Sequence, residues 1–226
     1  MPASDPFHAL VADARAFLSD LAQNNTRDWF AAHKHDYDGR LKTPATLLME
    51  QVAAEMARDG GPALRPKLFR PHRDVRFSRD KTPYHTHLHM LWSAGKPGPN
   101  QPGFFFGVSP EYVTLGGGLM GFDKPALDAW RKSVDGPDGE TLAAMIATLG
   151  QRGYSPREPE LKRVPAPYPA DHPHAELLRR KSLTVWREIP ENDWNEPLKF
   201  LPFAFAELAP LTDLLRAMTH STFGKT

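Results

Sequence analysis

Five basic residues lie close together in the first half of this 226-residue chain, and side chains of this type bind anions. Residues 69–84 read FRPHRDVRFSRDKTPY and carry Arg70, Arg73, Arg76, Arg79 and Lys81 against only two acids, Asp74 and Asp80. Over residues 65–96, eight Lys and Arg face two Asp, an excess of +6 in a chain whose net charge is +1. Since guanidinium groups match phosphate and carboxylate oxygens in pairs of hydrogen bonds, this excess predicts a site for an anionic ligand.

The chemistry of such a site assigns a role to individual residues. We expect Arg76 and Lys81 to hold the anion, with Arg70 and Arg163 assisting. The full set of candidate ligand-binding residues is Arg70, Arg73, Arg76, Ser78, Asp80, Lys81, Tyr84, Lys162 and Arg163. Asp74 or His87 is the candidate general acid or base if the ligand is turned over, because surrounding cations keep a carboxylate ionised and lower the pKa of a histidine. The residues leave open whether there is a reaction.

The same polar residues also fit two structural interpretations. An antiparallel sheet often leaves one face in water, where Asp74 would pair with Arg70 or Arg76 at little gain in stability. Alternatively, the Arg, Asp and Lys side chains form an internal polar network that holds the fold together. The excess of five basic residues over two carboxylates favours the ligand site.

Three histidines, His85, His87 and His89, alternate along a predicted strand, so their imidazoles emerge on one face. Three histidines can hold zinc or iron. However, successive residues on one face of a strand lie about 6.5 to 7 Å apart, and basic neighbours oppose a divalent cation. We therefore expect no metal, and instead a solvated row or one histidine that carries a proton. The residues leave any cofactor unknown.

A second basic segment, residues 161–187, contains Lys162, Arg163, Arg180 and Lys181. If this segment folds over the first cluster, the two would line one electropositive cleft, whose field favours anionic ligands. Arg180 and Lys181 also fit a simpler role near the end of a helix, where cations complement the helix dipole.

Composition narrows the class of protein. The chain has no cysteine, which excludes disulfides, thiol catalysis and thiolate metal sites. We find no signal-peptide pattern and no stretch that approaches the roughly 18 apolar residues of a membrane span, so we expect a cytoplasmic protein without a membrane partner. The near-neutral charge argues against a dedicated nucleic-acid binder. Gly116, Gly118 and Gly121 satisfy GxGxxG outside a βαβ unit, which favours turn glycines or close backbone approach over a dinucleotide site.

Hydrophobic spacing predicts the elements that position these residues. Strands are expected at residues 67–78, 84–92, 103–108, 112–115 and 183–189, the first two forming an antiparallel hairpin. Helices are expected at residues 7–21, at 26–41 with an interruption at Pro44 before 47–56, at 123–134 and 139–149, after Asp171, and at 198–218 with a break near Pro202 or Pro210.

These elements predict an α+β fold in which a mainly antiparallel sheet is packed by helices. No linker divides the chain, so we expect a single domain over residues 1–226. It would have an N-terminal helical part at 5–58, a sheet-containing part at 65–190 and a C-terminal helical part at 194–220.

Several motifs together resemble the uncharacterised DUF2461 family. They are NNTRDWF, RDVRFSRDKTPYHTH, the GGG run, and LKRVP followed by DHPHAELLRRKSL, and the resemblance covers residues 17–215. The family has no established biochemical role, so the resemblance implies positions and no activity. The family pattern touches Arg73, Asp74, Arg76, Phe77, Ser78, Asp80, Lys81, Pro83, Tyr84, Lys162 and Arg163. His85 and His89 depart from the pattern, which has Lys at the former and a small residue at the latter, and this further weakens a metal site.

Two functions follow as expectations. The first is a basic cleft near residues 70–87 that binds a small anionic ligand carrying phosphate or carboxylate. The alternative is a nucleic-acid or protein interaction module that uses the basic hairpin, with Tyr84 and Trp92 as contact surface. The oligomeric state stays open.

Overall fold

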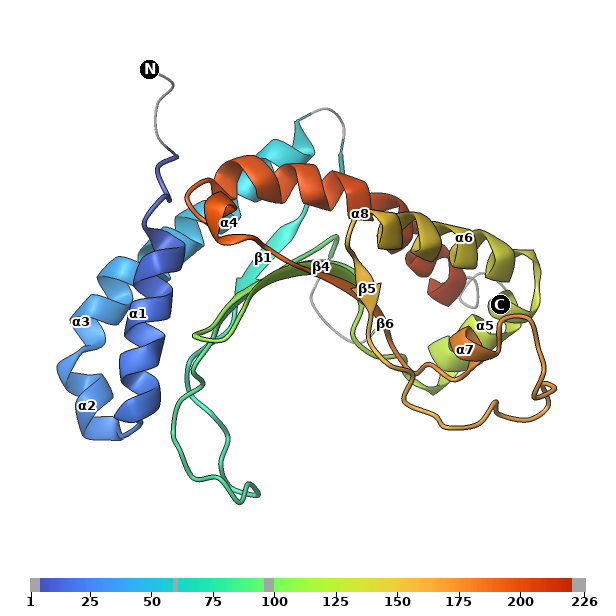
Figure 1. The fold of residues 1–226 in the computed structure, drawn as a ribbon, viewed down its shortest axis with the longest axis horizontal. Coiled ribbons are helices and arrows are strands. Elements are labelled where there is room, and N and C mark those ends of the chain that lie inside the picture. The colour runs from blue at the N-terminus through green and yellow to red at the C-terminus, as the bar shows by residue number, and fades with distance from the viewer. Residues whose placement is uncertain (1–4, 59–60, 96–99, 221–226) are drawn as a thin grey trace. The chain divides into compact units, whose positions relative to one another are not determined.

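The computed structural model describes residues 5–58, 61–95 and 100–220, and it confirms the α+β class (Figure 1). Its antiparallel sheet has six strands in the order β1-β2-β3-β4-β6-β5. The strands are β1 (Arg65–Leu68), β2 (Leu88–Ser93), β3 (Gly103–Val108), β4 (Val113–Leu119), β5 (Ser155–Pro156) and β6 (Leu183–Glu188). The strand predicted at residues 103–108 is confirmed, and all six of its residues are buried, as expected for a central strand with both faces covered.

The N-terminal helices are α1 (Leu10–Gln23), α2 (Arg27–Ala32), α3 (Lys34–Asp36), the π-helix η1 (Tyr37–Lys42) and α4 (Thr43–Ala57). Thr26 begins α2 as a cap, because its hydroxyl accepts from the backbone N–H of Trp29 at 3.2 Å. The interruption predicted at Pro44 is wrong. Pro44 lies in the first turn of α4, directly after the widened π-helical turns, where the missing N–H and the bulk of the ring are tolerated.

The glycine run lies inside β4 and forms no turn. A β-carbon at Gly116 would lie 2.3 Å from the carbonyl oxygen of Val185, and one at Gly118 would lie 2.1 Å from that of Leu183. Gly118 also has φ +133°, which side chains rarely adopt. Of the two predicted explanations, turn glycines or close backbone approach, the second therefore accounts for Gly116 and Gly118. Strand β4 continues four residues beyond the strand predicted at 112–115.

The remaining helices are α5 (Lys124–Asp135), α6 (Pro137–Gln151), α7 (Ala175–Leu178), the 3₁₀ turn η2 (Glu191–Asp193) and α8 (Pro197–His220). Asp123 begins α5, since its carboxylate accepts from the N–H of Ala126 at 2.9 Å. The break predicted in the last helix is wrong, because α8 continues through Pro202 and Pro210. Its apolar residues, such as Leu201 and Leu208, are fully buried, and this packing outweighs the local cost of proline.

Residue contacts group the chain into two compact units. The first comprises Met1–Trp92, Phe105–Leu115 and Glu188–Ala204, and the second comprises Ser93–Phe104, Gly116–Arg187 and Phe205–Thr226. In the first unit the buried Trp92 donates its indole N–H to the carbonyl of Met49 at 2.9 Å. In the second, the buried Trp130 does the same to Leu177 at 3.2 Å. Within the described residues, no helix combines the length and the apolar character needed to cross a bilayer.

Candidate functional site: a basic hairpin

Residues 69–89, here called the basic hairpin, connect β1 to β2 as two limbs that run away from the sheet (Figure 1). Three backbone hydrogen bonds join the limbs: Phe69 to His89 at 3.0 Å, His85 to Pro71 at 2.7 Å, and Arg73 to Pro83 at 2.9 Å. The predicted antiparallel pairing is therefore confirmed. The predicted length of the strands is wrong, because beyond Leu68 the first limb has only an isolated bridge.

The second limb of the basic hairpin is anchored to the N-terminal helices through Tyr84. Its ring is 6% exposed and stacks on Phe30 with centroids 4.1 Å apart. Asn25 holds its backbone from both sides, since the amide nitrogen donates to the Tyr84 carbonyl at 3.0 Å and the amide oxygen accepts from the Tyr84 N–H at 3.1 Å. Tyr84 thus stabilises the hairpin and, like the buried Trp92, offers no ring to a partner. Sequence reasoning missed Asn25, because no local pattern marks a side chain that bonds 59 residues away.

Arg73 links the two limbs of the basic hairpin. Its guanidinium donates to the carboxylate of Asp80, to the hydroxyl of Thr82, and to the carbonyl of Thr82 at 3.2 Å. Asp80 in turn accepts from the backbone N–H of Thr82 at 2.9 Å. This N–H, with Arg73 and the Thr82 hydroxyl, lowers the pKa of Asp80 to about 2. Arg73 and Asp80, both predicted site residues, are therefore already occupied with each other.

The tip of the basic hairpin, residues 74–81, holds a second ion pair that is exposed to solvent. Arg76 donates from Nε to Asp74 Oδ1 at 3.0 Å and from Nη2 to Oδ2 at 2.7 Å, with side chains 77% and 51% exposed. The same contacts lower the pKa of Asp74. Across the tip, Lys81 Nζ donates to the carbonyl of Val75 at 3.0 Å, and the Ser78 N–H donates to the same oxygen at 3.3 Å. These bonds close the loop without neutralising the charge of Lys81.

Three cations of the basic hairpin take part in neither of its two ion pairs. Within the described part of the chain, Arg70, Arg79 and Lys81 form no ion pair with a carboxylate, so the hairpin keeps the net +3 of its five basic and two acidic residues. Phe77, which lies in the strand predicted at residues 67–78, is 96% exposed beside Arg76, whose guanidinium carbon lies 5.9 Å from the centre of the ring. The tip therefore combines positive charge with a free aromatic ring.

The three histidines lie much closer together than a regular strand allows. The ring centroids of His87 and His89 are 3.6 Å apart, and those of His85 and His87 are 4.6 Å apart. Between the hydrogen-bonded pairs Phe69/His89 and Pro71/His85, one residue of the first limb faces three of the second, which is a bulge. The bulge draws the rings together. Stacked rings turn their faces, not their nitrogens, toward one another, and the described residues contain no His, Asp or Glu group able to hold a metal ion.

Burial and charge set the protonation of this stack. Burial, with a smaller effect of His85, lowers the pKa of His87 to about 4. The pKa of His85 is lowered by burial and by the charges of Arg73 and Arg70. His89 is hydrogen-bonded through Nε2 to the Tyr112 hydroxyl at 2.8 Å. Both oxygens of Asp74 are engaged by Arg76, and the pKa of His87 is lowered, so both candidates for moving a proton are weak bases.

The second basic segment lies in the second unit. Lys162 and Arg163 are exposed there, whereas Arg180 is buried and donates to the carbonyl of Arg157 and to the carboxylate of Glu176. Arg180 therefore links α7 to the segment that follows β5. A cleft shared with the basic hairpin stays a prediction.

Comparison with known proteins identifies the family of the chain. No protein with a curated description matches it. A family model described as "Conserved hypothetical protein (DUF2461)" matches residues 13–214, nearly the whole chain. The protein therefore belongs to the DUF2461 family, as its RFSRDKTPY and LKRVP motifs indicated.

Proposed function

We propose that the basic hairpin binds an anionic ligand through phosphate or carboxylate groups. The observation that carries this proposal is the imbalance of charge at the hairpin. Each of its two carboxylates forms an ion pair with one arginine, and among the described residues Arg70, Arg79 and Lys81 form none, although the charge of Arg70 also acts on Asp74. Exposed cations in one short segment attract anions, and their hydrogen bonds to a charged oxygen are stronger than those to a neutral acceptor.

Arg76 is available to the same ligand at small cost. Its pair with Asp74 is exposed on both sides, and exposed ion pairs contribute about 0.2 to 1 kcal/mol. An incoming dianion therefore competes with Asp74 for the two donors of the guanidinium. Arg73 is different, because it is largely covered and bonds to three groups at once, so its role is to hold the hairpin.

If the ligand is turned over, Asp74 or His87 would move the proton. Both are weak bases, because Arg76 holds the carboxylate of Asp74 and the pKa of His87 is about 4. The proposal for binding does not depend on this step.

Titration calorimetry with inorganic phosphate, and with pyrophosphate, at constant ionic strength tests the proposal. Replacing Arg79 and Lys81 together by Ala should weaken binding by roughly threefold to tenfold, from two exposed charge contacts. The matched control replaces Lys124 and Lys132, two exposed lysines of α5, and removes the same charge from elsewhere. Equal weakening by both double variants, or no measurable binding to the unaltered protein, would overturn the proposal.

A further inference from the structure

Among the described residues, the ring of Phe77 contributes almost no packing to the fold. Phe77 is 96% exposed and buries almost no surface, whereas Tyr84, on the second limb of the basic hairpin, is packed against Phe30. Single exposed apolar residues are common on proteins, so exposure alone says little. What distinguishes Phe77 is the loop that carries it.

The loop that carries Phe77 is closed by its own hydrogen bonds. Lys81 and Ser78 both donate to the carbonyl of Val75, and Arg76 is held by Asp74, on either side of the ring. A loop whose backbone is held in advance loses little conformational freedom when a partner binds it. The tip is thus preorganised to present one aromatic ring.

The charges around this ring indicate the partner. Arg76 lies beside the ring, and the uncompensated Arg79 and Lys81 follow within four residues. An aromatic ring for a base, with cations for the phosphates on either side, is the combination by which proteins bind single-stranded nucleic acid. We propose that the ligand of the basic hairpin is a single strand of nucleic acid, one of whose unpaired bases stacks on Phe77. This inference rests on the proposed function and names its ligand class.

Other anionic partners fit the tip less well. A bilayer surface binds a protein through a broad apolar face or several anchoring signals, and the tip offers a single exposed ring. A duplex keeps the faces of its bases stacked inside, so it gives Phe77 nothing to stack on. The aromatic contact also differs from the one expected from sequence, because Tyr84 and Trp92 are buried.

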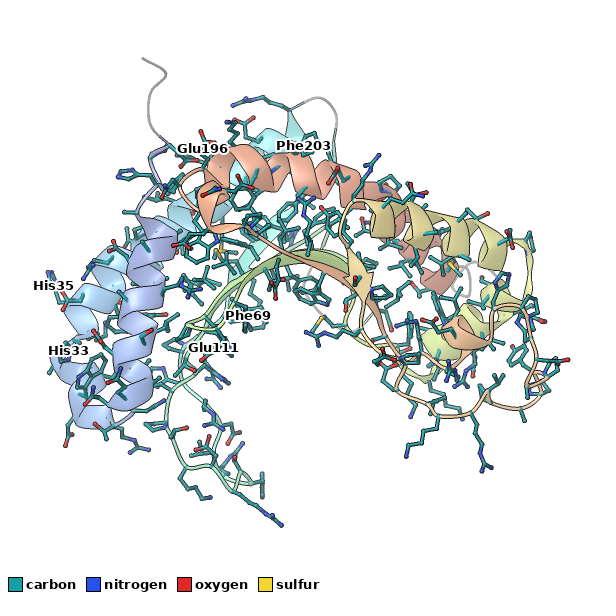
Figure 2. All side chains as sticks on the ribbon, viewed as in Figure 1. His33, His35, Phe69, Glu111, Glu196 and Phe203 are labelled. Carbon is teal, nitrogen blue, oxygen red and sulfur yellow. The ribbon has the colours of Figure 1, made fainter. Side chains whose placement is uncertain are left out.

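Fluorescence anisotropy with a labelled 12-nucleotide oligothymidylate at low salt tests the inference on the full chain. Phe77→Ala should weaken binding to the strand roughly tenfold, the effect of losing one stacked base. Phe77→Tyr, which keeps a ring, should bind like the unaltered protein. The matched control is Phe203→Ala, which removes another exposed Phe, 68% exposed on α8 and labelled in Figure 2. It should leave binding unchanged.

Inorganic polyphosphate separates this inference from the proposed function, because it has phosphates and no bases. Phe77→Ala should leave polyphosphate binding unchanged, and the Arg79 and Lys81 double variant should weaken both ligands. If Phe77→Ala does not affect the oligonucleotide, the stacking inference fails and anion binding stands. If neither polymer binds, both fail. Tighter binding to a duplex of equal length, binding to thymidine monophosphate but not to the strand, or binding only to vesicles rich in phosphatidylserine would each refute the single-strand assignment.

Discussion

The low pKa of His87 makes the stability of this protein depend on pH in a way that one substitution should remove. In the folded chain the pKa is about 4, against an ordinary value of 6.5, because the ring is half-buried and lies against the imidazoles of His85 and His89. Between these two values the unfolded chain binds a proton that the folded chain does not. The free energy of unfolding must therefore fall as the pH falls from about 6.5 to about 4, and this contribution levels off below pH 4.

The size of the effect follows from the same two values. At about 1.36 kcal/mol per pH unit, a fall in pKa from 6.5 to about 4 corresponds to about 3 kcal/mol if it is realised in full. His87 is only half-buried, so water screens part of this, and we expect about 1 to 2 kcal/mol. Its neighbour His85, beside Arg70 and Arg73, has a pKa lowered in the same direction and adds to the slope.

Urea unfolding at several pH values between 4 and 8 measures the effect. His87→Gln removes the titrating group, so its free energy of unfolding should fall less steeply than that of the unaltered protein, by about 1 to 2 kcal/mol between pH 7 and pH 4.5. His35→Gln, at an exposed histidine of α3, controls for the same substitution elsewhere (Figure 2). Parallel curves for the unaltered protein and His87→Gln would refute the reasoning. So would an NMR titration of the His87 ring with a midpoint near 6.5.

Three further predictions concern the hairpin and the sheet. Arg73→Ala should lower the free energy of unfolding by about 1 to 3 kcal/mol, because it leaves several polar groups unpaired. Arg76→Ala should change it by less than about 1 kcal/mol, because its ion pair is exposed. If urea unfolding gives the reverse order, the roles assigned to the two arginines are wrong. Asn25→Ala should cost about 1 to 3 kcal/mol, since both amide atoms bond to the hairpin backbone, and hydrogen exchange at the hairpin should then become faster. Gly118→Ala should lower the melting temperature sharply, because its β-carbon would lie 2.1 Å from a carbonyl oxygen at a positive φ, while Gly121→Ala, with open space around it, should not; similar melting temperatures would speak against the close strand contact.

Local signals predicted much of the framework, because they act over a few residues of chain. The caps at Thr26 and Asp123 use side chains that bond within three residues, and both lie where the sequence predicted the start of a helix. The strand at residues 103–108 was predicted because a short apolar run between turn residues has few alternatives. The concentration of charge at residues 70–81 needs no structure to be seen, since covalent connection alone keeps these residues together.

Contacts between distant residues decided the rest. Period-two spacing placed Phe77 in a strand at residues 67–78, but the regular strand ends at Leu68 and the ring is exposed. A bulge, which depends on how two strands align, brought His87 and His89 into stacking distance. The amino-acid sequence by itself determined the kind of chemistry available, an excess of cations on a short segment. Only the tertiary structure decided which of these cations are occupied by carboxylates and which stay free, because that depends on side-chain geometry and on anchors such as Asn25 that lie far away in the chain.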